Sequence, residues 1–242
     1  MSTRDSIYSE PLETISGFTF DDKVAAVFPD MIKRSVPGYS SVIAMTGVLA
    51  SLYAQSNTDC YDLGCSLGES TFAMRSQIAV NDCSIIAVDN SQQMLDQCMK
   101  NLTLSTGEAT VDFICDDILN ISLNKSSVVV LNYTLQFISY EKRDELLNKI
   151  YQSLEPGGIL LLSEKIEYTD KKLNERMISM HHEFKKANGY SDLEISQKRS
   201  ALENVLLPET IDAHQNRLNK SGFSKIDIWF QCFNFVSLIA YK

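Results

Sequence analysis

The chain of 242 residues has no apolar run that approaches the roughly 18 to 20 residues of a membrane span. Its first residues, MSTRDSIYSEPLET, carry acids and lack the apolar segment of a secretory signal peptide. With 44% hydrophobic and 22% charged residues, the composition is not that of a disordered chain. We therefore expect a cytoplasmic protein without a membrane partner, folded as a single domain over residues 1–242.

Positive charge is also scarce. Lys and Arg number 22 against 31 Asp and Glu, which gives a formal net charge of −9. A protein that binds RNA neutralises several phosphates with basic side chains. Adjacent basic residues occur here at most two at a time, as in Lys33-Arg34 and Lys198-Arg199. The charge balance favours a small-molecule partner over direct binding to nucleic acid.

Paired metal-ligand motifs are missing as well. The six cysteines include no C-x-x-C pair, and most lie within or beside apolar runs. His181-His182 is followed by Glu183 and lacks the i, i+4 histidine spacing of a helical zinc site. We expect buried, reduced thiols and no bound metal.

Hydrophobic periodicity predicts an α/β fold. Residues 1–57 contain two helical patterns, FDDKVAAVF and SSVIAMTGVLASLYAQ, which predict an N-terminal helical cover. From residue 59 onward, short apolar runs alternate with helical segments. The predicted strands are DCYDLG, CSIIAVD, TVDFICDD, SSVVVLNYTLQF and ILLLSEK. Strands that are apolar on both faces and joined by helices form a parallel sheet covered on both sides.

The C-terminal part predicts a last helix, PETIDAHQNRLNKSGF, followed by a hairpin of SKIDIWFQC and FNFVSLIAYK. The hairpin brings the predicted sheet to seven strands, mostly parallel with one antiparallel strand at the C-terminal end. Residues 165–207 form a charged helical insertion before the last helix. That insertion is too long for a plain loop, so we expect a lid or a dimer interface.

The stretch YDLGCSLGES admits three interpretations. Gly64 to Gly68 reads G-x-S-x-G, as in the nucleophile elbow of α/β-hydrolases, but only helical sequence precedes its strand. A dinucleotide loop needs glycine where Ser66 stands, and Glu69 occupies the helix start that a phosphate would use. A nucleoside ligand without phosphate fits best, because the glycines bring the backbone close to it.

Polar residues follow the predicted strands in a way that suits such a nucleoside. Asp89 can accept hydrogen bonds from both ribose hydroxyls, with the amide of Asn90 beside it. In Asp116-Asp117-Ile118 a carboxylate can accept from an exocyclic adenine amine while Ile118 packs on the ring. Together with Asn132, these residues lie at carboxyl ends of strands, where open α/β sheets bind ligands.

This constellation, with its terminal hairpin, resembles the class I, Rossmann-like fold of S-adenosylmethionine-dependent methyltransferases. Other blocks narrow the resemblance to the carboxy-S-adenosyl-L-methionine synthase family, from about Arg4 to the C-terminus. Those blocks are FPDMIKRSVPGYS, YDLGCSLG, VDNSQQM, VVLNYTLQF, MHHEFKKANGYSDLEISQKRSALENVL and WFQCFNF.

The resemblance implies that S-adenosyl-L-methionine and prephenate are converted into carboxy-S-adenosyl-L-methionine and phenylpyruvate. It also implies a homodimer and a downstream enzyme that uses the product to build 5-oxyacetyl uridine at the tRNA wobble position. By the same resemblance, the residues that contact the cofactor are Tyr39, Gly64, Cys65, Ser66, Asp89, Asn90, Asp117, Ile118, Asn132 and Arg199.

Arg199 is the residue to which the resemblance assigns a catalytic role. A sulfonium acidifies its methyl group, so an ylide can capture carbon dioxide released from prephenate, and a guanidinium can pair with the new carboxylate. By composition alone, Lys198-Arg199 is typical of a solvated helix face. The sequence leaves open whether Arg199 serves its own site or a partner subunit's. Nor does it show which of Arg34, Lys165 and Arg199 contacts prephenate.

The sequence leaves two alternative functions open. One is an S-adenosylmethionine-dependent tRNA uridine methyltransferase, which the acidic charge disfavours. The other is a noncatalytic cofactor-binding partner of a tRNA-modifying enzyme, which would leave Arg199 and the insertion at residues 165–207 without a reaction to serve.

Overall fold

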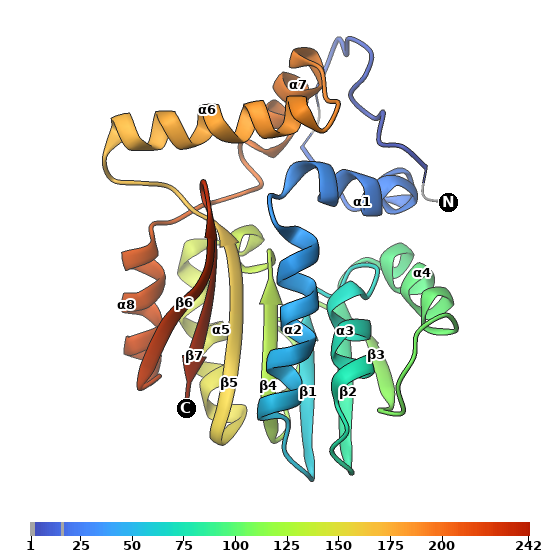
Figure 1. The fold of residues 1–242 in the computed structure, drawn as a ribbon, viewed down its shortest axis with the longest axis vertical. Helices are drawn as coiled ribbons and strands as arrows, with labels where there is room; N and C mark the ends of the chain where they lie inside the picture. Colours follow the sequence, from blue (N-terminus) through green and yellow to red (C-terminus); the bar gives the residue numbers. More distant parts are fainter. Residues whose placement is uncertain (1–2, 16) are drawn as a thin grey trace.

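The structure is a computed structural model that describes residues 3–15 and 17–242, so residues 1, 2 and 16 of the expected N-terminal cover lie outside the described part. Its centre is one seven-stranded sheet with the order β3-β2-β1-β4-β5-β7-β6. The strands are β1 (Thr58–Leu63), β2 (Cys83–Asp89), β3 (Val111–Cys115), β4 (Ser126–Asn132), β5 (Leu154–Lys165), β6 (Lys225–Cys232) and β7 (Phe235–Tyr241). Figure 1 shows this sheet with helices in front of it, behind it and above it.

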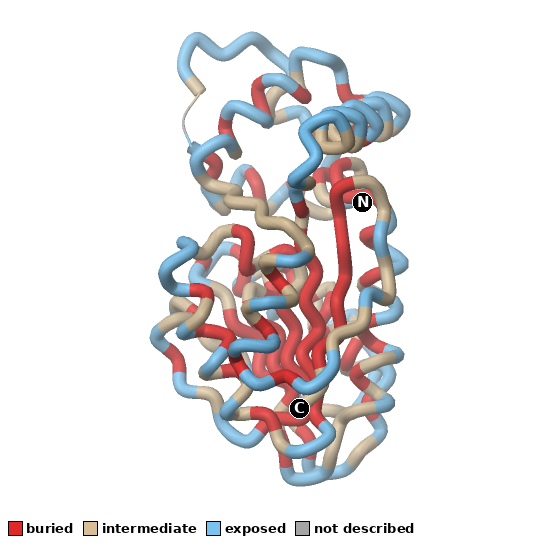
Figure 2. The backbone as a smooth tube through the Cα atoms, turned by 90° about the vertical axis from the view of Figure 1, so that its left-hand side faces the viewer, coloured by how far each residue is buried: buried red, intermediate tan, exposed pale blue. Residues whose placement is uncertain are grey.

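The predicted fold class is confirmed. Strands β1 to β5 pair in parallel, and β7 runs antiparallel to both β5 and β6. Sequential strands joined through helices give the parallel part, whereas two residues separate β6 from β7 and allow only a hairpin. Figure 2 shows the buried segments concentrated along the strands in the middle of the molecule.

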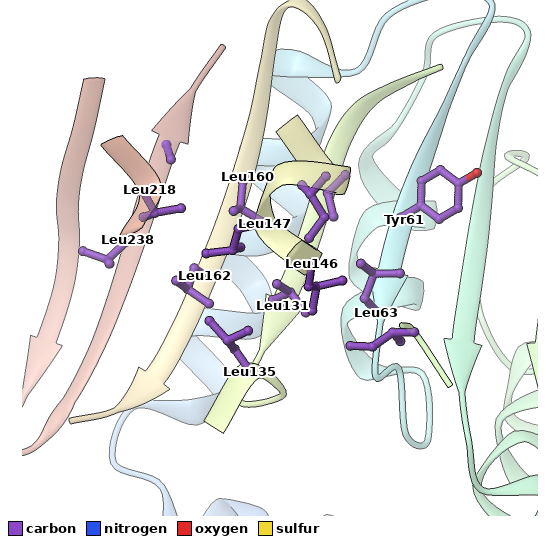
Figure 3. Close-up of a cluster of buried hydrophobic side chains, with 14 of the residues drawn as sticks. Tyr61, Leu63, Leu131, Leu135, Leu146, Leu147, Leu160, Leu162, Leu218 and Leu238 are labelled. Atoms are coloured by element: carbon purple, nitrogen blue, oxygen red, sulfur yellow. The ribbon is translucent and has the colours of Figure 1, made fainter. Parts of the chain in front are cut away.

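Helices cover both faces of the sheet. On one face lie α2 (Tyr39–Tyr53), α3 (Glu69–Gln77) and α4 (Gln92–Leu102); on the other lie α5 (Tyr140–Ser153) and α8 (Ile211–Ser221). The face under α5 and α8 has the larger core, in which leucines of α5 and α8 pack against those of the strands (Figure 3). The opposite face is packed with smaller side chains from α2, α3 and the same strands.

Three further helices, α1 (Asp22–Ser35), α6 (Lys171–Ala187) and α7 (Asp192–Leu202), lie beyond the carboxyl ends of the parallel strands (Figure 1). Their starts follow from capping residues: Asp21 caps α1, Asp170 caps α6, and Ser191 forms a capping box with Glu194 at α7. The insertion at residues 165–207 is therefore helical, as expected, and it lies over the edge of the sheet where the site was predicted.

One predicted strand pattern was too long. Asn132 ends β4, as its expected place at the carboxyl end of a strand requires, but the rest of the run SSVVVLNYTLQF is not strand, and residues Leu135–Phe137 form a 3₁₀ helix. Tyr133 adopts a positive φ of 62° there, and the Leu135 N–H donates to the buried Glu164 carboxylate (3.0 Å). Helix α3 begins at Glu69, the helix start expected from the sequence, because Gly68 before it has a left-handed φ of 87°.

A buried arginine connects α5 with the end of the insertion. Arg143 is fully buried and forms an ion pair with Glu209. It also donates hydrogen bonds to the Ile138 carbonyl (2.9 Å) and the Leu207 carbonyl (2.7 Å). The segment that returns from α7 to the sheet is thus fixed by one side chain.

In the part of the chain that the structure describes, no single helix is both long and apolar enough to cross a membrane. Helices α1 and α2 satisfy that length and composition test only when taken together, and they meet at a bend of 98°.

Candidate functional site

A cavity of about 440 Å³ lies at the carboxyl ends of the parallel strands, beneath α1, α6 and α7. Its volume is within the range of small-molecule sites in proteins. Nine of the ten predicted contact residues line it, namely Tyr39, Gly64, Cys65, Ser66, Asp89, Asn90, Asp117, Ile118 and Asn132. Residues spread over nearly one hundred positions of sequence therefore meet in one place.

The loop between β1 and α3 forms one wall with its backbone. Gly64 has a φ of 84°, and a Cβ there would lie 2.4 Å from the Thr134 hydroxyl. Ser66 is also left-handed, with a φ of 51°. No bulky side chain fits at Gly64, so the main chain itself faces the cavity. Glu69 is the first residue of α3 and lines the cavity, which disfavours a phosphate at this helix start.

Asp89 at the end of β2 holds this loop. Its Oδ2 accepts a hydrogen bond from the Ser66 N–H (2.8 Å), and its Oδ1 accepts from the Ser91 N–H (2.9 Å). Burial raises the pKa of the Asp89 carboxyl above its ordinary value, while the hydrogen bonds from Ser91 and Ser66 oppose that shift. Each oxygen keeps a further lone pair, so the carboxylate can accept from two neighbouring hydroxyls of a ribose.

Asn132 at the end of β4 offers an unused acceptor. Its Nδ2 donates to the Thr46 hydroxyl (3.2 Å) and the Ser70 hydroxyl (2.9 Å), which fixes the orientation of the amide. Its Oδ1 is buried and has no hydrogen-bond partner among the described residues. A buried acceptor without a donor is unfavourable, so this oxygen suits a ligand that brings an N–H or ammonium group.

Asp62 does not line the cavity, although it lies beside the glycine loop in sequence. The Thr71 hydroxyl donates to its Oδ2 (2.6 Å), and burial raises its pKa to about 6. Its role is to join β1 to α3.

An aromatic group forms the apolar wall. The Phe20 ring lies 5.5 Å from that of Phe137 and 6.1 Å from that of Phe28, and all three line the cavity beside Ile118. The Ser91 hydroxyl donates to the Phe20 carbonyl (2.8 Å), which ties the N-terminal cover to the start of α4. This wall suits a flat heterocycle. Sequence reasoning missed it, because Phe20 was read as part of a helix and Phe137 as part of a strand.

The chain is similar to known proteins over nearly its whole length. A family model described as "Methyltransferase domain" matches residues 61–158. The carboxy-S-adenosyl-L-methionine synthase of Photorhabdus laumondii is 52% identical over 239 residues, which cover 99% of this chain and 95% of that protein. The synthase of Yersinia pestis is 53% identical over 239 residues, covering 99% and 90%. The chain belongs to the carboxy-S-adenosyl-L-methionine synthase family.

Solved structures agree on the fold of this synthase family member. An O-methyltransferase family protein from Burkholderia thailandensis superposes with a TM-score of 0.63 at 15% identity, covering 92% of this chain and 60% of that one. Human N-acetylserotonin methyltransferase in complex with SAM gives a TM-score of 0.60 at 17% identity, covering 91% and 55%. The whole-chain relatives support the synthase interpretation and not the tRNA methyltransferase alternative.

Arg199, the tenth predicted contact of this synthase family member, is not among the cavity residues. It lies exposed on α7. Burial lowers the pKa of Lys165 and of Lys185, both of which line the cavity, and the charge of Arg199 adds to that shift. Its neighbour Lys198 is buried, which the solvated-face reading of the pair did not predict.

Several cavity residues of this synthase family member escaped sequence reasoning. They are Lys185, Lys198 and His181, which come from α6 and α7 and join Lys165 from β5. His181 Nε2 is 2.7 Å from the Ser35 carbonyl, and burial lowers its pKa far below the ordinary value. The sequence showed only isolated basic pairs, and no periodic signal marked which member of each pair is buried.

The geometry bears on the nucleophile-elbow interpretation of Ser66, on metal binding and on the cysteines. The Ser66 hydroxyl contacts the Met94 sulfur (3.6 Å) and not a histidine, so it lacks the base of a hydrolytic triad. Within residues 3–15 and 17–242, no group of three or more His, Cys, Asp or Glu side chains could hold a metal ion. Four of the six cysteines are buried thiols, whereas Cys115 is exposed and Cys232 half-buried.

Proposed function

We propose that the protein converts S-adenosyl-L-methionine and prephenate into carboxy-S-adenosyl-L-methionine and phenylpyruvate. The observation that carries the proposal is a cavity lined by nine of the ten expected contacts, in a chain 52–53% identical to curated synthases. The proposal includes a cytoplasmic homodimer and use of the product by a downstream enzyme that modifies the tRNA wobble uridine.

The cavity residues suggest how S-adenosyl-L-methionine is held. Asp89 accepts the ribose hydroxyls, while Ile118 and the aromatic wall enclose the adenine ring and Asp117 accepts its amine. At the other end, the free Oδ1 of Asn132 accepts from the α-ammonium group. The backbone of Gly64 and the side chain of Tyr39 complete the contacts to the amino-acid end.

The overall reaction needs no metal or redox partner. The S-methyl group loses a proton, and prephenate loses carbon dioxide and its ring hydroxyl as it becomes aromatic phenylpyruvate. The carbon dioxide forms a bond with the methyl carbon, and the proton and the hydroxide leave as water. An enclosed site favours this capture, because water would protonate a carbanion.

The direct test is turnover. We expect the purified protein, incubated with S-adenosyl-L-methionine and prephenate, to yield carboxylated cofactor and phenylpyruvate in equal amounts, measured by mass spectrometry. Omission of prephenate should leave the cofactor unchanged. Methyl transfer to unmodified tRNA instead would support the methyltransferase alternative, and binding without turnover would support the noncatalytic one.

Arg199 is proposed to pair with the new carboxylate of the product. We expect Arg199→Ala to weaken binding of carboxy-S-adenosyl-L-methionine about ten- to hundred-fold, the loss of one charged hydrogen-bonded pair. Binding of S-adenosyl-L-methionine, which lacks that carboxylate, should stay within about twofold of wild type. Isothermal titration calorimetry with each ligand measures both, and equal affinity of the variant and wild type for the product would refute the pairing.

A mixing experiment determines which subunit's Arg199 acts. An Asp89→Ala subunit is expected not to hold the cofactor, and an Arg199→Ala subunit lacks the guanidinium. If Arg199 reaches the partner's site, mixed dimers of the two variants regain turnover in one site. If it serves its own site, mixtures stay as inactive as the two variants measured separately.

A further inference from the structure

Lys165 and Lys185 place two amino groups in the cavity without partners. Lys165 ends β5, and Lys185 lies in the last turn of α6. Lys185 is only 9% exposed. Among the described residues, neither side-chain nitrogen has a hydrogen-bond acceptor within reach, and neither lysine forms an ion pair.

The surroundings of these two lysines are cationic. Burial, followed by the charges of Lys165, Lys198 and Arg199, lowers the pKa of Lys185 to about 7. His181 and His182 lie nearby, and the pKa of each is lowered as well, mainly by burial. In a chain with a net charge of −9, this concentration of positive side chains at one cavity is costly unless an anion compensates it.

The neighbouring carboxylates form no ion pair with Lys165 or Lys185. The Asp5 carboxylate lies 3.6 Å from the Lys198 amino group and also accepts from the Tyr190 hydroxyl, so it compensates Lys198. Glu164 directly precedes Lys165 but is fully buried; its Oε1 accepts from the Leu135 N–H, and its Oε2 has no partner among the described residues. No carboxylate of the described residues therefore neutralises Lys165 or Lys185.

Arg34, one of the three basic residues left open for prephenate, is also engaged. It donates to the Asp30 carboxylate (3.0 Å), the Asn188 carbonyl (2.7 Å) and the Asp5 carbonyl (3.2 Å), and it stacks on Tyr190 at 3.8 Å. Its Nη2 is buried without a hydrogen-bond partner among the described residues, but the side chain does not line the cavity. The structure therefore leaves Lys165 and Lys185 as the cavity cations with free hydrogen-bonding capacity.

We propose that Lys165 and Lys185 bind the second substrate, a dicarboxylate, through its carboxylate groups. The identification of that dicarboxylate as prephenate rests on the proposed function. One amino group comes from β5 and the other from α6, so together they can hold a divalent anion in one orientation. The two lysines meet at the cavity because α6 lies over the end of β5. The insertion thus completes the subsite for the carboxyl donor of the reaction.

The test separates binding from turnover. S-adenosylhomocysteine lacks the sulfonium methyl group, so prephenate titrated into the protein saturated with it reports binding alone. We expect Lys165→Met and Lys185→Met each to raise the Kd of prephenate about ten- to hundred-fold. The Kd of S-adenosylhomocysteine should stay within about twofold of wild type. Lys172→Met, an exposed position on α6, is the matched control and should change neither Kd.

A variant that retains the positive charge distinguishes a loss of prephenate binding from a change in the structure of the site. Lys185→Arg should recover much of the prephenate affinity lost in Lys185→Met. Prephenate affinities of the two Met variants equal to wild type would overturn the proposal, as would an equal loss of S-adenosylhomocysteine affinity. If prephenate binding required both lysines but wild type formed no carboxylated cofactor, the proposed function would fail and this inference would stand.

Discussion

Replacing Asp89 with alanine is expected to raise the Kd of S-adenosyl-L-methionine by about a hundred-fold or more. The carboxylate is proposed to accept the two ribose hydroxyls, and hydrogen bonds to a charged group contribute about 1.5 to 3 kcal/mol each. It also accepts from the Ser66 and Ser91 N–H groups, so its removal releases the loop that forms the cavity wall. Titration calorimetry of the purified variant measures the loss.

Asp112→Ala supplies the control for this result. Asp112 is exposed on β3, adjacent to β2, and it does not line the cavity. Its replacement should leave the Kd unchanged. If Asp89→Ala bound the cofactor within about threefold of wild type, Asp89 would not be the ribose contact.

The second large effect is on stability. Arg143→Met should lower the free energy of unfolding by about 3 to 5 kcal/mol, the cost of removing one partner from a buried ion pair. Methionine fills much of the space but donates no hydrogen bond, so the carbonyls of Ile138 and Leu207 lose their donor. Glu209 keeps its pairing with Arg217 (2.6 Å), which sets the lower end of the range. Urea unfolding followed by circular dichroism measures the change.

Arg176→Met is the comparison for Arg143→Met, because Arg176 is exposed on α6 and its loss should change stability by less than about 0.5 kcal/mol. Equal unfolding midpoints for the two variants would contradict the role assigned to Arg143. A further consequence is local, since loss of Arg143 should increase hydrogen exchange at residues 205–209 more than in the strands.

The fold could be predicted because its signals are local. Apolar runs such as CSIIAVD match β2 from its first residue to its last. The predicted strand was wrong where a tertiary contact determines the backbone conformation. SSVVVLNYTLQF reads as one strand, yet it turns at Tyr133 because the N–H of Leu135 bonds to Glu164, a residue of another strand.

The residues proposed to hold the cofactor could also be found from the sequence. The glycine loop and Ile118 follow strands, Asp89 and Asn132 end strands, and parallel strands bring their carboxyl ends to one edge. The proposed prephenate subsite was only partly accessible, since the sequence named Lys165 as one of three candidates but not Lys185. Lys165, Lys185 and Lys198 belong to a strand and two helices with no common motif, and they meet only because the insertion folds over the sheet.

The order of elements, the sheet and the family could be inferred from the amino-acid sequence, because hydrophobic period, capping residues and glycine positions act within a few residues of each other. Which member of each basic pair is buried follows from tertiary packing: Lys185 and Lys198 line the cavity, whereas Lys186 and Arg199 are exposed. Burial depends on how a helix rotates against distant neighbours, and adjacent residues on a helix point about 100° apart. Side chains that are equivalent in the sequence therefore become chemically different in the folded protein.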